Sequence, residues 1–284
     1  MSTRERYPSD LTDVQWDNIE HLFPPERQPP GKPGRHRTYP RREIVNAVFY
    51  LARAGCAWRM LPHDFPPWKT VSYYFYTWRD QGIWEEVHGV LRVSVRRLDD
   101  REDTPSGAII DGQSVKTTEA GGPKGYDAGK KVSGRKRHLL VDTLGLIWGL
   151  AVLPAAPTDW DGAVEVFKRS GGSLPRLAKV WADANYRVNA LLGWIAANCR
   201  WVLEVVTGRP GQRTFEVQPM RWIVERTFGW FGRYRRLSKD YETYPKNSET
   251  WILVAMLHRM ARSQLPRRDP DLDLLRRPPR RQKT

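Results

Sequence analysis

Cysteine is scarce in this chain, and long apolar runs are absent. The 284 residues contain only Cys56 and Cys199, with no CxxC spacing. A disulfide framework and a structural zinc site are therefore not expected, and the composition fits a reducing cytosol. No stretch approaches about 18 consecutive apolar residues, and the N-terminus lacks the apolar segment of a signal peptide. We expect a cytoplasmic, nucleoid-associated protein that binds no membrane.

Acidic residues are few beside basic ones. Lysine and arginine number 47 against 32 aspartates and glutamates, which gives a formal net charge of +15. An excess of this size favours a polyanionic partner, because basic residues that neutralise phosphates release condensed counterions. A soluble protein that is merely basic is the alternative. The length allows one large or two modest domains.

The first 100 residues carry helical patterns of apolar residues. Helices are predicted over 9–23, 41–54 and 84–98, and around 71–78. We expect an all-helical N-terminal domain over 1–100 that binds DNA. A plain helical bundle is the alternative, because the 13 residues between Ala54 and Trp68 exceed the short turn of a strict helix-turn-helix.

The pattern changes after about residue 100. Strands are predicted over 107–111, 135–142, 146–154, 177–183 and 201–206, and helices over 160–168, over 187–198 and around Glu225. Antiparallel strands followed by βαβ units predict an α/β domain with a mixed sheet flanked by helices. By analogy of fold, this order matches a ribonuclease-H-like domain, here over 101–265. The basic tail over 266–284 is expected to be disordered or to lie along an anion.

Two aspartates stand where predicted strands end. Asp111 closes the strand over 107–111, and Asp183 closes the strand over 177–183. Ligand sites in sheets with βα connections lie at the carboxyl ends of strands, so these carboxylates become neighbours if the two strands pair. Like charges so close repel one another unless a cation holds them, and divalent metal ions do this well.

Glu225 lies in the otherwise largely apolar helical stretch RWIVERTFGW. At about 100° per residue, its helix face carries Arg221, Gly229, Gly232 and Arg236. Each glycine costs about 1 kcal/mol of helix stability, which is tolerated where another backbone, such as a nucleic-acid strand, comes close. With the two aspartates, Glu225 forms a ligand set for Mg²⁺ or Mn²⁺. Two such ions would serve both phosphodiester cleavage and strand transfer.

Each of these acids also has a simpler interpretation. Asp111 could be a turn residue before Gly112. Asp183 could be the N-cap of the helix that follows it, and Glu225 could form an ion pair with Arg221. The combination of all three at these positions favours a shared site. Four other acids have local explanations in a hairpin turn, helix caps or a glycine-rich loop: Asp142, Asp159, Asp161 and Asp127.

Basic residues flank the acids in three runs. Six lysines and arginines occur between Gly121 and Arg137, against one aspartate. A solvated charge run is the alternative, but three runs around one acidic trio favour contacts to a nucleic-acid backbone. The residues expected to bind DNA are Lys116, Lys130, Lys131, Arg135, Lys136, Arg137, Arg187, Arg221, Arg226, Arg233 and Arg236.

Several blocks of the sequence resemble, in order, the motifs of insertion-sequence transposases of the insertion-sequence-five (IS4/IS5-like) type. They are IDGQSVK, SGRKRHLLVDTLGL, VWADANYR and RWIVERTFGWFGRYRRLSKDYE. YPSDLTDVQW and CAWRMLPHDFPPW are similar to the N-terminal helical domain of the same family. The resemblance extends from about Tyr7 to about Arg262. It implies a ribonuclease-H-like fold and a DDE triad that transfers onto Asp111, Asp183 and Glu225.

The resemblance also implies Mg²⁺, cleavage at terminal inverted repeats, and attack of 3′-hydroxyl ends on target DNA by a dimer or higher synaptic complex. The chain departs from the family motifs where Gln218 and Gly232 replace a tyrosine and a lysine, and where Asn185 replaces a glycine. Two other functions stay open. One is a catalytically inactive DNA-binding protein, and the other is a ribonuclease-H-like nuclease without strand transfer.

Overall fold

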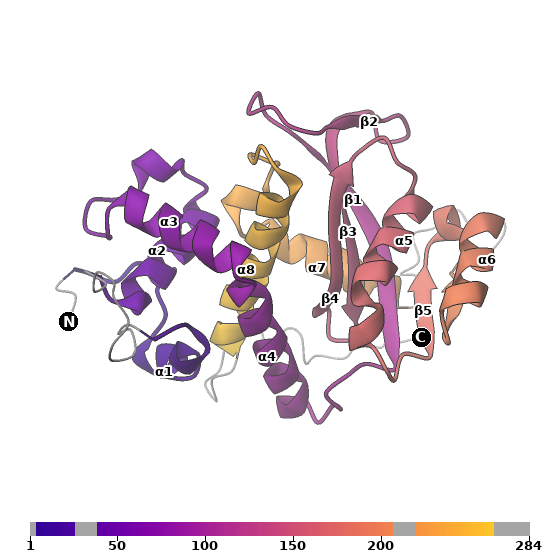
Figure 1. The fold of residues 1–284 in the computed structure, drawn as a ribbon, viewed down its shortest axis with the longest axis horizontal. Coiled ribbons are helices and arrows are strands. Elements are labelled where there is room, and N and C mark those ends of the chain that lie inside the picture. Colours follow the sequence, from indigo (N-terminus) through magenta and orange to yellow (C-terminus); the bar gives the residue numbers. More distant parts are fainter. Residues whose placement is uncertain (1–3, 26–38, 207–219, 264–284) are drawn as a thin grey trace, which may run out of the picture.

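A computed structural model describes residues 4–25, 39–206 and 220–263. An N-terminal group of helices lies to one side of a mixed sheet, and helices cover both faces of that sheet (Figure 1). The tail over 266–284 lies outside the described residues. Within the described ranges, no helix is long and apolar enough to cross a membrane.

Four α-helices make up most of the N-terminal region. They are α1 (Asp13–Asp17), α2 (Arg41–Ala54), α3 (Trp68–Asp80) and α4 (Ile83–Leu98), with 3-10 turns at Glu20–Leu22 and Trp58–Met60. The last three confirm the helices predicted from apolar periodicity. α2 ends at Gly55, which adopts φ +71°, a left-handed conformation that glycine accepts without strain.

The single helix predicted over 9–23 is wrong in its extent. Thr12 begins α1 through a capping box with Gln15, but Asn18 already ends the helix. Leu11 and Phe23, outside the helix at either side, are buried in the core. Tertiary packing of these apolar residues therefore holds the segment in an irregular path.

The sheet contains parallel and antiparallel pairs. Its strands are β1 (Gly107–Lys116), β2 (Gly125–Asp127), β3 (Val132–Asp142), β4 (Ile147–Pro154), β5 (Lys179–Ala182) and β6 (Val202–Val205). The order is β2-β3-β1-β5-β6, with β4 also paired to β3. β5 is parallel to β1 and β6, whereas β3 is antiparallel to β1 and β4. This arrangement confirms the predicted mixed sheet.

Two hydrophobic clusters cover the two faces of the sheet. One contains Ile110 and Leu140 and packs beneath α5 (Asp159–Ser170) and α6 (Asn189–Asn198). The other contains Ile109 and Leu139 and packs against α7 (Arg221–Phe231) and α8 (Pro245–Ser263). Neighbouring residues of β1 and β3 enter different clusters because side chains alternate along a strand.

The long helix α8 lies between the sheet and the N-terminal helices (Figure 1). Residues from both regions, such as Phe75 of α3 and Trp251 of α8, stack at 4.4 Å within one cluster. The division of the chain near residue 100 stays a prediction, since one core runs across it. α8 was not predicted, because it is buried on nearly every side and shows little of the amphipathic period of a surface helix.

Candidate active site

Parallel pairing of β1 with β5 brings two of the predicted acids to the same end of the sheet. Gly107–Ile109 pair with Lys179–Trp181, so Asp111 and Asp183 follow the paired segment together. Asp183 Oδ1 accepts a hydrogen bond from the Asn185 amide at 2.9 Å and is the N-cap of a 3-10 turn. The N-cap interpretation of Asp183 is thus confirmed, and its other oxygen faces Arg221.

Arg221 connects the third acid to this pair. Its Nη2 lies 3.8 Å from Asp183 Oδ2 and 3.6 Å from Glu225 Oε1. Arg221 and Glu225 are one turn apart on α7, and α7 packs against β1. The Glu225 side chain is 56% exposed, so the ion pair alone contributes little stability. The two distances from Arg221 show that Asp183 and Glu225 lie around the same guanidinium group.

Burial raises the pKa of Asp111 to about 6, and the negative charge of Asp183 adds to the rise. The Gly112 amide, which donates to Asp111 Oδ1 at 2.7 Å, lowers the pKa, as do Lys130 and Arg221. A desolvated carboxyl group next to a second acid is typical of functional sites.

Asp111→Asn is expected to stabilise the metal-free protein at neutral pH. The folded-state pKa of about 6 lies above the usual 3.8, so above pH 6 the native fold holds a carboxylate that it disfavours. Removing that charge should raise the free energy of unfolding by about 2 to 3 kcal/mol at pH 7.5. The gain should fade as the pH drops toward 4, where Asp111 is protonated. Urea unfolding in EDTA across this range measures it, and a variant less stable than wild type at pH 7.5 would contradict the buried charge.

The ligand chemistry of the site fits a divalent metal ion. Asp111, Asp183 and Glu225 offer only carboxylate oxygens, the ligands that Mg²⁺ and Mn²⁺ prefer. The guanidinium of Arg221 lies between the carboxylates of Asp183 and Glu225, as a bound metal ion would. In the arrangement observed, the described residues contain no group of three or more His, Cys, Asp or Glu side chains placed to hold a metal ion.

Several of the predicted DNA contacts are exposed: Lys116, Lys130, Lys131, Arg187 and Arg233. Lys130 lies close to the acids, because its ammonium donates to the Gly112 carbonyl at 3.0 Å, one residue beyond Asp111. Arg187 follows Asp183 directly after the 3-10 turn. Arg226 is half-buried between Trp222 and Trp230 and donates to the Leu144 carbonyl at 2.9 Å.

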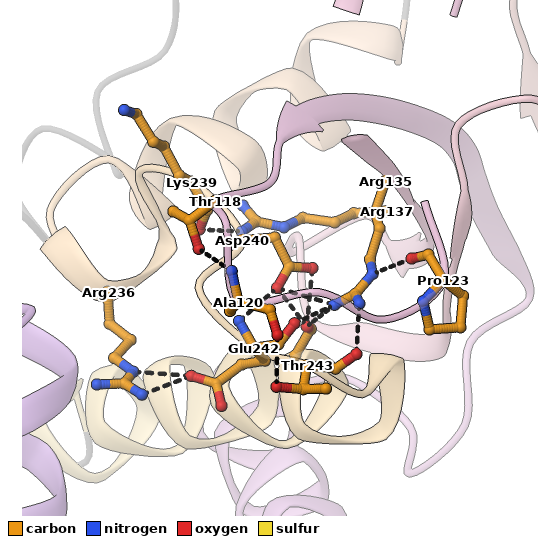
Figure 2. Close-up of polar contacts among 11 residues, drawn as sticks. Thr118, Ala120, Pro123, Arg135, Arg137, Arg236, Lys239, Asp240, Glu242 and Thr243 are labelled. Atoms are coloured by element: carbon orange, nitrogen blue, oxygen red, sulfur yellow. Dashed lines mark hydrogen bonds and ion pairs between the residues drawn. The ribbon is translucent and has the colours of Figure 1, made fainter. Parts of the chain in front are cut away.

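The other four predicted DNA contacts are buried: Arg135, Lys136, Arg137 and Arg236. Arg135 donates to the carbonyls of Glu242 and Thr243, each at 2.6 Å, and lies 3.2 Å from Asp240 (Figure 2). Arg137 donates to the Leu237 carbonyl at 2.8 Å. These guanidinium groups have backbone and carboxylate partners inside the protein and face no solvent.

The remaining two buried cations are also paired with acids. Arg236 binds Glu242 at 2.5 Å, and it lies in a 3-10 turn after α7, so the prediction that it shares the helix face of Glu225 is wrong. Lys136 lies 3.1 Å from Asp159 and 3.5 Å from Asp127. The expectation that these four cations contact DNA is therefore corrected, because their enclosure gives them a structural role.

Two residues near the acids, Asp159 and Tyr186, were not predicted to belong to the site. Asp159 was interpreted as a helix cap, but Thr158 and Asp161 form the capping box of α5, and Asp159 pairs with Lys136 instead. The hydroxyl of Tyr186 is buried without a hydrogen-bond partner in the described structure. Burial raises the pKa of Tyr186, and the charges of nearby acids, Asp111 first, add to the rise. Only its place in the motif VWADANYR pointed to this tyrosine.

The mixed sheet, the helices on both of its faces and the acids within β1 and directly after β5 define a ribonuclease-H-like α/β domain preceded by helices. A family profile described as "Transposase DDE domain" matches residues 102–260, which is more than half of the chain. The chain belongs to this family of transposases. A second profile, described as "Putative transposase of IS4/5 family (DUF4096)", matches residues 11–88.

One relative of similar sequence comes from Sinorhizobium fredii (strain NBRC 101917 / NGR234). It is the "Uncharacterized protein y4sN", which is 31% identical over 81 residues. The match covers 28% of this chain and 62% of the relative, so the chain spans less than two thirds of the relative's length.

Proposed function

We propose that this chain cleaves DNA at the terminal inverted repeats of an insertion sequence and joins the 3′-hydroxyl ends to target DNA. Membership of the transposase family supports this class of activity. The observation that carries the proposal is the position of Asp183 and Glu225 around Arg221, with Asp111 within the neighbouring strand β1. These acids, far apart in the sequence, lie on the neighbouring strand β1, directly after β5 and on α7.

In this proposal Asp111, Asp183 and Glu225 hold one or two Mg²⁺ (or Mn²⁺) ions. Such ions, when bound, activate a water or 3′-hydroxyl and stabilise the leaving oxygen at phosphorus. Arg221 balances the acids and offers its guanidinium to a phosphate oxygen. The exposed cations nearby position the DNA backbone: Lys116, Lys130, Lys131, Arg187 and Arg233.

The remaining parts of the proposal concern organisation. Residues 1–100 would bind DNA, 101–265 would carry the chemistry, and the tail over 266–284 would add positive charge. The protein would work in the nucleoid as a homodimer or a higher synaptic complex, since two transposon ends and a target must meet.

The test is a strand-transfer assay with the full chain. Labelled duplex carrying the ends of the element that encodes this chain is incubated with a target plasmid and Mg²⁺, and EDTA is added in a parallel reaction. The expected result is nicked ends covalently joined to the plasmid, in the Mg²⁺ reaction only. Cleavage without joining would indicate a nuclease of the same fold. A mobility shift without cleavage would indicate a DNA-binding protein that has lost catalysis.

A further inference from the structure

Residues 238–244 form a short connection whose side chains divide between the interior and the surface. Asp240 and Glu242 are buried, whereas Lys239, Tyr241 and Tyr244 are exposed. Tyr244 exposes 65% and Tyr241 37% of its surface. Aromatic rings next to basic side chains on a surface are typical of nucleic-acid binding.

This connection pairs with the end of β1. Thr117 forms a parallel bridge with Asp240, whose amide donates to the Lys116 carbonyl at 2.8 Å. Because side chains alternate along paired segments, the register sets Lys116 beside Lys239, on the side opposite Asp240. Two like charges in neighbouring positions repel one another, so the pair is destabilising unless an anion lies between them.

The two acids of this connection are already neutralised. Asp240 pairs with Arg135 at 3.2 Å, and Glu242 pairs with Arg236 at 2.5 Å. By contrast, the side chains of Lys116, Lys124 and Lys239 form no hydrogen bond or ion pair within the described part of the chain. An exposed acid, Glu119, lies in the adjoining loop. The outward surface therefore carries an excess of unpaired positive charge.

The buried arginines hold this surface in place from below. Arg137 donates to the Lys239 carbonyl at 3.1 Å, and Arg135 donates to the Thr243 carbonyl at 2.6 Å. In Figure 2 the Lys239 side chain points away from the network that binds its own backbone. A rigid backbone under exposed cations reduces the ordering cost of binding a ligand.

The surface also lies along the same edge of β1 as the acids. β5 pairs with β1 at Gly107–Ile109 and is followed by Asp183. Further along the chain, Thr117, which directly follows β1, pairs with Asp240 of the connection. Asp111 and Lys116 are separated by about 17 Å of extended strand, which is the rise of about five base pairs of duplex DNA. Because side chains alternate along a strand, Asp111 and Lys116 project from opposite faces of β1, so a duplex that contacts both lies across the edge of β1 on which β5 and the connection pair.

We propose that Lys116, Lys239, Tyr241 and Tyr244, which we call the lysine–tyrosine platform, bind the backbone of duplex DNA beside the site of cleavage. This inference rests on the proposed function and adds a contact surface to it. Phosphates relieve the repulsion between the two lysines, and the tyrosine rings pack on the sugar or donate hydroxyl groups to phosphate oxygens. The buried arginines contribute by fixing the platform and do not contact DNA.

The test is equilibrium binding of the full chain to a labelled random-sequence duplex of about 40 base pairs, at salt concentrations between about 50 and 200 mM. The variant Lys239→Glu/Tyr244→Ala should bind at least tenfold more weakly and should lower the salt dependence by about one phosphate contact. The matched control Lys168→Glu makes the same charge change on α5, at an exposed lysine away from the platform. It should bind within about twofold of wild type.

A crosslinking experiment covers the case of a variant that misfolds. p-Benzoylphenylalanine in place of Tyr244 should form a photo-crosslink to the duplex, and the same residue in place of the exposed Leu192 on α6 should not. If wild type binds duplex DNA but only the protein substituted at Leu192 forms a crosslink, or if the platform variant binds as wild type does, the platform is refuted while the proposed function stands. If wild type does not bind duplex DNA at all, both proposals fall.

Discussion

Asp183→Asn is expected to lower the rate of DNA nicking by roughly 10³-fold or more while leaving duplex affinity near that of wild type. In the proposed site the Asp183 carboxylate is a ligand of the metal ion, and its Oδ2 faces Arg221. The charge of Asp183 is expected to lower the activation free energy of the metal-assisted step by several kcal/mol, and about 1.4 kcal/mol corresponds to a tenfold change in rate. Affinity should persist because it depends mainly on cations that contact phosphates.

The asparagine keeps the local fold, which makes this variant informative. Its side-chain oxygen can still accept the hydrogen bond from the Asn185 amide that begins the 3-10 turn. Glu165→Gln is the matched control, because it removes a carboxylate of α5 that pairs, among the residues that the structure describes, only with surface Arg169. Nicking of plasmid DNA in Mg²⁺, and in Mn²⁺, measures both. Nicking by Asp183→Asn at the rate of the control would show that the metal ligands lie elsewhere.

Periodicity predicted α3 and α4, which each bury one stripe against the core. α2 was also predicted from a stripe of apolar residues, although its burial is wider and includes all of 44–49. α8 was not predicted from periodicity, because tertiary packing buries every residue from Trp251 through Leu257 and leaves no polar face there. β1 extends past Asp111 through Gly112, Gln113 and Ser114, residues of low strand propensity that pairing with β3 holds in place.

The acids of the candidate site were visible in the sequence because position in an element carries chemical meaning. Asp111 lies within β1, Asp183 directly follows β5, and Arg221 pairs with both Asp183 and Glu225. The simpler interpretations were also correct in part, since Asp183 is an N-cap and Glu225 does pair with Arg221. Local roles and a shared site are compatible, because a carboxylate has two oxygens.

The basic residues were harder to assign, because the run RKR in β3 has the same composition whether it faces solvent or the interior. Arg135 and Arg137 point to a face of the sheet that residues 237–243 cover, and these residues lie about a hundred positions further along the chain. No local signal marks the carbonyl groups that accept their hydrogen bonds. The acids of the segment RLSKDYE were the available hint, since Asp240 and Glu242 alternate with exposed residues.

Arg135→Met is expected to destabilise the protein by about 3 to 5 kcal/mol, the second large effect. The substitution keeps much of the side-chain volume but leaves the buried Asp240 without its cation at 3.2 Å. It also removes hydrogen bonds to the carbonyls of Pro123, Glu242 and Thr243. Urea unfolding measures the loss. Because the same bonds hold the lysine–tyrosine platform, duplex affinity should fall as well, even below the unfolding transition.

A double variant separates the charge from the packing. Arg135→Met/Asp240→Leu should recover part of the lost stability, because it removes the unpaired carboxylate and replaces the ion pair with apolar volume. Arg97→Met is the control, since Arg97 pairs with Asp103 on the surface and its loss should change the urea midpoint little. If Arg135→Met unfolds at the midpoint of this control, the network around Asp240 contributes no net stability. The close fit of residues 237–243 onto β3 would then depend on apolar packing alone.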